Sequence, residues 1–292
     1  MKILIFGHKG QLGVDLMECA GQKSVEAIGV DLPQYDITSV SDVSRVLDDT
    51  GSIDVVINAA AYTAVDQAES QSDAAFAVNR DGPGHLASAC RRKGIPLIHI
   101  STDYVFEGLQ TRPYTPKDAI GPQGVYARSK AAGEAMVRKR LDRHLIIRIS
   151  WLFGRYGANF VKTMLRLGKE REVVKVVDDQ IGSPTYAGDL AQALLCVAEK
   201  ISEGFSSWGT YHYCNAGALT WYAFARKIFA FARFHEHLAV KDVVPILTAH
   251  YPTPAPRPYY SVLDCSGFDE TFGIVRRPWE AALKQMLSEH YA

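Results

Sequence analysis

The chain has 292 residues, of which 47% are hydrophobic and 22% are charged. These proportions are typical of a soluble globular protein with one large domain or two fused ones, and they exclude a largely disordered or collagen-like chain. Lys and Arg together number 32, as do Asp and Glu, so the formal net charge is zero. Nucleic acid is therefore not an expected partner, because proteins that neutralise many phosphates are usually basic.

The five cysteines are scattered along the chain and form no C-x-x-C pair: Cys19, Cys90, Cys196, Cys214 and Cys265. Such a set argues against a disulfide framework or a zinc site, so no metal is predicted and a reducing, cytoplasmic location is expected. No apolar run approaches the roughly 18 residues that a membrane helix needs. The apolar run at residues 3–6 is too short for the core of a signal peptide.

Short apolar runs alternate with helical segments through the first half of the chain. Such runs suit parallel strands buried on both faces, and the alternation predicts an α/β fold with a doubly wound parallel sheet, the Rossmann arrangement. Residues 1–150 are therefore expected to form a dinucleotide-binding domain. The expected strands are residues 3–6, 27–30, 54–57, 97–100 and 145–149, and the expected helices lie around Leu16 and at residues 40–49, 68–93 and 129–140.

A glycine-rich turn follows the first expected strand and opens a helix. It reads Gly7-His8-Lys9-Gly10-Gln11-Leu12-Gly13, a G-x-x-G-x-x-G spacing. Glycines at such a turn let the backbone approach a pyrophosphate, which then lies on the helix N-terminus. Its position in the first βαβ unit indicates a dinucleotide cofactor.

Asp31 ends the second expected strand, where a carboxylate can accept hydrogen bonds from the adenosine ribose and would repel a 2′-phosphate. Asp36 and Ile37 are further candidates beside the adenine. Lys9 lies inside the phosphate turn and could meet the extra phosphate of NADPH. We therefore expect NADH to be favoured over NADPH with incomplete discrimination.

Small residues follow the third expected strand, in the segment Asn58-Ala59-Ala60-Ala61-Tyr62-Thr63. Three alanines at a strand end leave room for a flat ligand against the backbone. A tightly packed strand–helix junction would use the same residues.

A hydroxyl, a phenol and an amine occur in an order that suits reduction of a carbonyl. Thr102 follows the fourth expected strand, and Tyr126 and Lys130 are four residues apart on one expected helix face. A lysine ammonium near a phenol lowers the phenol pKa from about 10, which would make Tyr126 a proton donor near neutral pH. Thr102 could orient the carbonyl.

The alternation weakens after residue 150, so residues 151–292 are expected to form a smaller, mixed, mainly substrate-binding region, with some segments returning to the Rossmann sheet. The pattern predicts helices at 159–171, 188–200 and 221–235 and strands at 173–177 and 210–214. The proline-rich segment 251–258 could fix Arg257 against a substrate diphosphate. Lys162 and Arg166 are weaker candidates for the same role.

The set of motifs resembles the extended short-chain dehydrogenase/reductase family and, within it, the dTDP-4-dehydrorhamnose reductases. The resemblance runs from the first strand to the last helix. It rests on NAAAYTAVD from Asn58, STDYVF from Ser101, SWLFG from Ser150, NFVKTML from Asn159, DQIGSPT from Asp179 and YPTPAPRP from Tyr251.

The resemblance implies a role for each matching residue. Tyr126 would be the proton donor, Lys130 would hold the nicotinamide ribose, and Thr102 and Asp103 would face the sugar, with Trp151 lining its pocket. Further residues would bind the cofactor: Gly10, Gln11, Leu12, Asp31, Asp36, Ile37, Ala61, Tyr62 and Thr63. Some members are associated with Mg²⁺ at a dimer contact. The resemblance allows a homodimer, but the sequence offers no carboxylate cluster to assign to Mg²⁺.

The expected reaction is NAD(P)H-dependent reduction of the C4 keto group of dTDP-4-dehydro-β-L-rhamnose to dTDP-L-rhamnose. Two alternatives stay open. A sugar-nucleotide 4-epimerase would retain its cofactor through purification and consume no net NADH. A non-catalytic NADP-binding regulatory subunit, like the beta subunit of methionine adenosyltransferase, would co-purify with a catalytic partner. A binding subunit has no need of a proton donor, so Thr102, Tyr126 and Lys130 argue against it.

Overall fold

A computed structural model describes all 292 residues and contains the predicted doubly wound sheet. Six parallel strands lie in the order β10-β5-β4-β3-β1-β2. Their bounds are β1 Lys2–Phe6, β2 Glu26–Val30, β3 Val55–Asn58, β4 Leu97–Thr102, β5 His144–Ile149 and β10 Gly209–His212. The edge strand β10 comes from the second half of the chain.

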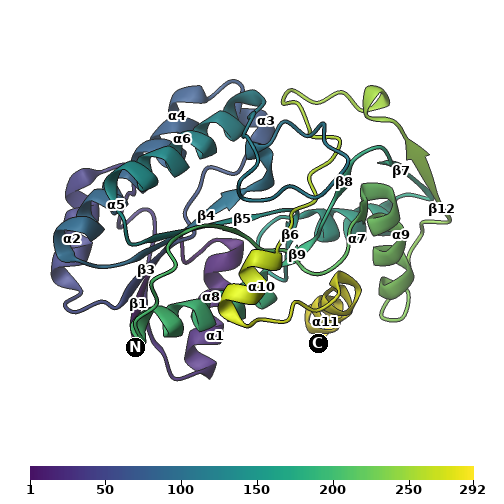
Figure 1. The fold of residues 1–292 in the computed structure, drawn as a ribbon. Coiled ribbons are helices and arrows are strands. Elements are labelled where there is room, and N and C mark those ends of the chain that lie inside the picture. Colours follow the sequence, from purple (N-terminus) through teal and green to yellow (C-terminus); the bar gives the residue numbers. More distant parts are fainter.

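Helices cover both faces of this sheet (Figure 1). On one face lie α1 Gln11–Gln22, α8 Ala187–Ser202 and α10 Ser266–Phe272, and on the other lie α2 Val40–Asp49, α5 Gly82–Lys93 and α6 Gly124–Arg140. Each helix layer buries a hydrophobic cluster against the strands. The strands are all-apolar because they are buried on both faces, as the sequence suggested.

The remaining elements form a second lobe around its own apolar cluster (Figure 1). Strands β7 Val173–Val177 and β12 Asp242–Ile246 pair in parallel against α7 Phe160–Glu170, α9 Trp221–Ala232 and α11 Trp279–Tyr291. Short pairs connect the lobe to the main sheet: β6 Leu152–Phe153 with β9 Thr185–Tyr186, and β8 Ile181–Gly182 with β11 Leu219–Thr220. Single 3₁₀ turns occur at Asp103–Val105 and Thr248–His250.

The prediction of a single helix at residues 68–93 was wrong. The chain instead forms α3 Val65–Ala68, α4 Ser72–Phe76, a π-helical turn Ala77–Asp81, and then α5. Pro83 lacks a backbone N–H, so a regular hydrogen-bond ladder cannot pass through it. The helix expected at 129–140 begins earlier, at Gly124, which places Tyr126 in the first turn of α6.

The π-helical turn crosses α6 at a point where only glycine fits. A Cβ added at Gly133 would lie 2.0 Å from the carbonyl oxygen of Asn79. The missing side chain therefore lets α6 lie directly on the turn that precedes α5.

Gly133→Ala should destabilise the protein by about 1–3 kcal/mol, because the methyl group must push α6 away from the turn. The free energy of unfolding in urea measures this. Gly21→Ala is the matched control: it lies in α1 with nothing within 4 Å of its added Cβ, so it should stabilise by about 0.5–1 kcal/mol. Equal effects of the two substitutions would contradict the close crossing.

Candidate active site

The predicted functional segments meet at the carboxyl edge of the sheet. Strands β1, β3, β4 and β5 end at Phe6, Asn58, Thr102 and Ile149. Because parallel neighbours end at the same edge, the segments after these strands open on one crevice, which is where α/β sheets bind ligands.

The glycine-rich turn has the geometry of a phosphate cradle. Gly7 adopts φ +83°, and a Cβ there would lie 2.5 Å from the amide nitrogen of Ala60. A Cβ on Gly13 would lie 2.1 Å from the carbonyl oxygen of Gly7. The N-cap of α1 is Gly10, which supplies no side-chain cap, so the first N–H groups of the helix are left to bind an anion. These features fit a dinucleotide pyrophosphate.

Asp31 and Lys9 lie together beside this turn. The Asp31 carboxylate accepts hydrogen bonds from the backbone N–H groups of Lys9 (2.9 Å) and Leu32 (2.8 Å). The Lys9 ammonium donates to the carbonyl of Leu32 at 2.8 Å. A carboxylate suited to ribose hydroxyls and a cation suited to a 2′-phosphate therefore occupy the same corner.

Asp36 and Ile37 are arranged differently from each other. One oxygen of Asp36 accepts hydrogen bonds from the backbone N–H and the hydroxyl of Thr38, both at 2.8 Å. Ile37 is buried in the core beneath Gly82. Asp36 thus fixes a turn with one oxygen, and Ile37 belongs to the hydrophobic layer behind it.

Asn79 connects the segment Ala61-Tyr62-Thr63 to the helix that carries Tyr126. Its side chain accepts from the N–H of Tyr62 (2.8 Å) and donates to the Tyr62 carbonyl (3.0 Å) and to the Ser129 hydroxyl (3.0 Å). Sequence reasoning missed Asn79. The only signal was a polar residue in a long helical pattern, which does not distinguish a buried bridge from a solvated position.

Glu69 fixes the start of α6 from outside the helix. Its carboxylate accepts from the N–H of Val125 at 2.7 Å, while the N-cap residue Gln123 makes no side-chain cap. A carboxylate at a helix N-terminus is favourable for the helix dipole. Glu69 thereby helps to place Tyr126, one residue further on, and sequence reasoning also missed it.

Thr102 and Tyr126 lie next to each other, Lys130 lies one turn further along α6, and the electrostatics differ from the prediction. Lys130 is buried and donates a hydrogen bond of 2.7 Å to the carbonyl of Ile100. Burial raises the pKa of Tyr126 to about 12, although the adjacent Thr102 hydroxyl opposes the shift. The expectation of a lowered phenol pKa was therefore wrong for this arrangement, because desolvation of the phenolate outweighs its stabilisation. The phenol stays protonated at neutral pH, as a proton donor must.

A buried ion pair lies below Lys130 on the same helix. Arg148 of β5 donates two hydrogen bonds to Glu134, at 2.8 and 2.7 Å, and both residues are almost fully buried. Burial alone would raise the pKa of Glu134, but the bonds from Arg148 hold it at about 2. This carboxylate therefore remains charged beneath the Lys130 ammonium.

Asp103 forms a polar cluster behind Thr102. It accepts hydrogen bonds of 3.0 Å from the hydroxyls of Thr102 and Ser150. Burial raises its pKa to about 6, and bonds from Ser261, Ser150 and Thr102 oppose that rise. Asp103 thus anchors Thr102 to the end of β5 and carries a charge that responds to pH near neutrality.

Arg257 reaches the crevice from the proline-rich segment. It donates to Asp66 at 2.8 Å, and its guanidinium lies over the ring of Tyr104, 5.9 Å from the centroid. Tyr104 in turn packs edge-on against Tyr126 at 5.7 Å. One guanidinium nitrogen, Nη1, is buried without a hydrogen-bond partner.

The two weaker cation candidates do not join Arg257. Arg166 pairs with Glu170 at 2.9 Å on the exposed face of α7, with 61% of its side chain accessible. Lys162 donates to the carbonyl of Arg155 at 3.3 Å. In α7 it is Asn159, the N-cap, that reaches the glycine-rich turn, since its amide donates to Gln11 at 2.8 Å.

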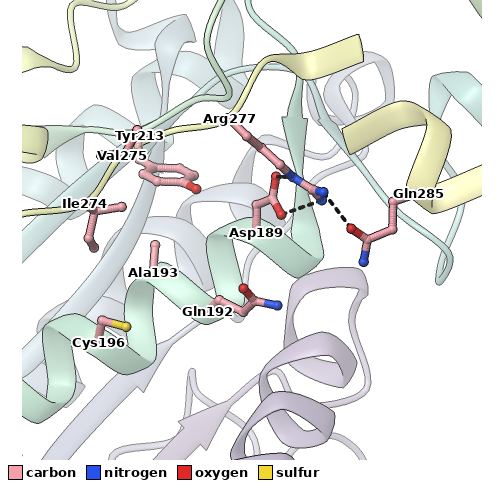
Figure 2. Close-up of a pocket in the computed structure, with 9 residues that line it drawn as sticks. All are labelled: Asp189, Gln192, Ala193, Cys196, Tyr213, Ile274, Val275, Arg277 and Gln285. Atoms are coloured by element: carbon pink, nitrogen blue, oxygen red, sulfur yellow. Dashed lines mark hydrogen bonds and ion pairs between the residues drawn. The ribbon is translucent and has the colours of Figure 1, made fainter. Parts of the chain in front are cut away.

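A separate cavity of about 290 Å³ lies at α8 and the segment before α11. Figure 2 shows Arg277 between Asp189 and Gln285 in this cavity, hydrogen-bonded to both. No residue predicted to bind cofactor or substrate lines it. The candidate site is therefore the crevice at the strand ends.

None of the helices combines the length and the apolar character that a membrane-spanning segment requires. The chain also has no group of three or more His, Cys, Asp or Glu side chains placed to hold a metal ion.

A Rossmann-type sheet, a phosphate cradle and a Thr–Tyr–Lys set at one edge define a nicotinamide-dependent oxidoreductase of the extended short-chain type. The family model described as RmlD substrate binding domain matches residues 1–292, and the chain belongs to that family. A dTDP-4-dehydrorhamnose reductase from Aggregatibacter actinomycetemcomitans is 43% identical over 288 residues, which cover 98% of each chain.

Solved structures agree with this membership. The dTDP-4-dehydrorhamnose reductase of Clostridium acetobutylicum has a TM-score of 0.92 and 40% identity, with 99% of each chain covered. The enzyme of the same name from Bacillus anthracis, solved with NADP, has a TM-score of 0.91 and 39% identity, covering 99% of this chain and all of the other. The resemblance read from the sequence motifs is thereby confirmed.

Burial of Lys130 should reduce stability at neutral pH. Burial lowers its pKa from 10.5 to about 8, so the unfolded chain binds this proton more tightly than the folded one. The cost is fully present below pH 8, on the order of 3 kcal/mol, and disappears as pH rises through 10.5. Lys130→Met should therefore be more stable than the parent at pH 7, with a smaller difference at pH 10.

Urea unfolding at the two pH values measures this difference. Lys175→Met, at an exposed position of β7, is the control and should show no such pH dependence. A stability difference for Lys130→Met that is the same at both pH values would contradict a buried ammonium.

Proposed function

We propose that this protein reduces the C4 keto group of dTDP-4-dehydro-β-L-rhamnose to give dTDP-L-rhamnose, with a hydride supplied by NADH or NADPH. The observation that carries the proposal is the Tyr126 phenol, partly buried beside the Thr102 hydroxyl at the carboxyl edge of the sheet. Full-length relatives that are named dTDP-4-dehydrorhamnose reductases support the substrate.

The cofactor, when bound, supplies the hydride that adds to C4. Tyr126 donates its proton to the oxygen of the carbonyl as negative charge develops there, and Thr102 orients that oxygen by hydrogen bonding. Lys130 binds the nicotinamide ribose and provides positive charge near the phenol. Because Tyr126 is neutral below its raised pKa, the donor is ready at neutral pH without a preceding proton transfer.

The cofactor residues are proposed as a group: Gly7, Gly10, Gln11, Leu12, Gly13, Asp31, Asp36, Ile37, Ala61, Tyr62, Thr63, Tyr126 and Lys130. For the substrate we propose Thr102, Asp103 and Trp151 at the sugar and Arg257 at the diphosphate. The position of the Arg257 guanidinium over Tyr104, which packs against Tyr126, supports its role. In this division, residues 1–150 bind the dinucleotide and residues 151–292 mainly bind the substrate.

The proposal includes a location but no protein partner. Five cysteines without disulfides support a cytoplasmic location. The homodimer that the resemblance allows carries no step of this mechanism. A 4-epimerase or a non-catalytic regulatory subunit would share the fold, and the two are separated from a reductase by net cofactor consumption.

Cofactor choice should depend on the corner formed by Lys9 and Asp31. We propose that NADH is favoured, since Asp31 repels a 2′-phosphate, and that Lys9 permits NADPH, the oxidised form of which accompanies the Bacillus anthracis relative. Lys9→Met should lower kcat/KM with NADPH by roughly tenfold and leave that with NADH nearly unchanged, the scale of one charge-assisted contact. Asp31→Ala should move the NADPH-to-NADH ratio the opposite way. Equal loss with both cofactors in Lys9→Met would contradict this assignment.

Tyr126→Phe tests the proposed chemistry most sharply. Removing the proton donor should lower turnover by roughly 100-fold or more, whereas cofactor affinity measured by fluorescence titration should be largely kept. Tyr211→Phe is a matched control that should keep parent turnover. Tyr211 lies on β10, and its hydroxyl donates to the carbonyl of Ser207 in the preceding loop. Near-parent turnover in Tyr126→Phe would remove Tyr126 from this role.

A further inference from the structure

Trp151 has a backbone conformation that a bulky residue rarely adopts. It follows Ser150 at the end of β5 with φ +48°. Left-handed backbone at a large side chain is strained and persists only where the surroundings hold it. Neighbouring residues must therefore hold both the backbone and the ring of Trp151, which is expected to line the sugar pocket.

Thr185 of β9 holds the backbone on one side. Its N–H donates to the carbonyl of Trp151 at 3.1 Å, and its hydroxyl donates to the carbonyl of Ser150 at 2.6 Å. Thr185 is fully buried. Two adjacent peptide groups are therefore fixed by a single residue.

The indole ring is held in a slot between Trp221 and Gly182. The Trp151 and Trp221 rings are stacked with centroids 3.4 Å apart and planes 9° apart. Trp221 begins α9 and packs against Phe160, with centroids 4.4 Å apart. A Cβ on Gly182 would lie 2.4 Å from the Trp151 ring, so the absence of a side chain at Gly182 makes the slot wide enough.

This slot is connected to the catalytic cluster. Ser150, the neighbour of Trp151, donates to Asp103 at 3.0 Å. Ile181, the neighbour of Gly182, accepts a backbone hydrogen bond of 2.8 Å from Ser261, whose side chain also bonds to Asp103. Both sides of the slot are thus joined to the carboxylate next to Thr102.

We propose that Trp221 and Gly182 are positioning residues that hold the Trp151 indole as a rigid wall of the sugar subsite and so contribute to recognition of the hexose part of the sugar nucleotide. This inference rests on the proposed function, because the ligand it names is the sugar of that substrate. Trp151 stays partly exposed in the slot, and the apolar surface of its ring suits the C–H groups of a deoxyhexose. Because the Trp151 indole is already fixed, sugar binding does not require the loss of entropy that ordering this side chain would involve.

The test compares ligands with and without the sugar. Calorimetry with dTDP-L-rhamnose and with dTDP gives an affinity ratio that isolates the hexose contribution. Trp221→Leu should reduce that ratio roughly threefold to tenfold, the scale of one aromatic contact. Trp221→Phe should recover most of the ratio because a ring still stacks, and Gly182→Ala should reduce it by displacing the indole. Cofactor affinity should stay unchanged in all three variants.

A spectroscopic signature reports the stack itself. Two stacked indoles give a paired positive and negative band in the far-ultraviolet circular dichroism spectrum. Trp221→Leu and Trp221→Phe should lose it, and Trp208→Phe, a substitution that leaves this pair intact, should keep it. Loss of the band with an unchanged affinity ratio in both Trp221 variants would overturn the proposal, as would an equal loss of affinity for dTDP. Cofactor consumption by the parent protein tests the proposed reaction separately.

Discussion

The ammonium group of Lys130 is enclosed by the protein, where it donates to the carbonyl of Ile100 at 2.7 Å. A buried charge is tolerated only where hydrogen bonds and opposite charge compensate its loss of water. Glu134, one turn further along α6, provides that charge, and Arg148 of β5 keeps Glu134 ionised. Lys130 thus joins α6 to β4 through the carbonyl of Ile100. The Glu134–Arg148 pair, which compensates the charge of Lys130, joins α6 to β5.

The arrangement of Tyr126 follows from this attachment. Glu69 binds the first turn of α6, and Asn79 links α6 to the Tyr62 segment. These contacts help to place the phenol of Tyr126 next to Thr102. The phenol is partly buried there, and burial raises its pKa and keeps it a donor. Positioning and protonation therefore have a common origin in burial, which is how a preorganised site stabilises developing charge.

The sequence predicted the parts of this account that depend on local pattern. Each main strand of the first half lies within two residues of its expected range, since all-apolar runs identify buried parallel strands. Thr102 at the end of β4 and Tyr126 in the first turn of α6 lie next to each other, as their order in the sequence suggested. The single helix expected at 68–93 was wrong although Pro83 is visible in the sequence, and the contact of Asn79 with Gly133 was missed because it is a tertiary contact. Glu69, Glu134 and Arg148 were missed for the same reason, and the pKa of Tyr126 because desolvation depends on the complete fold.

The most direct measurement follows the absorbance of NADH, and separately of NADPH, when the purified protein meets dTDP-4-dehydro-6-deoxyglucose with and without a 3,5-epimerase that converts it to the rhamnose precursor. The account predicts loss of the reduced cofactor only when the epimerase is present, because only then does the C4 ketone have the L-rhamno configuration of the proposed substrate. Absence of any loss with either cofactor, despite measurable cofactor binding, would contradict the reductase and favour an epimerase or a regulatory subunit.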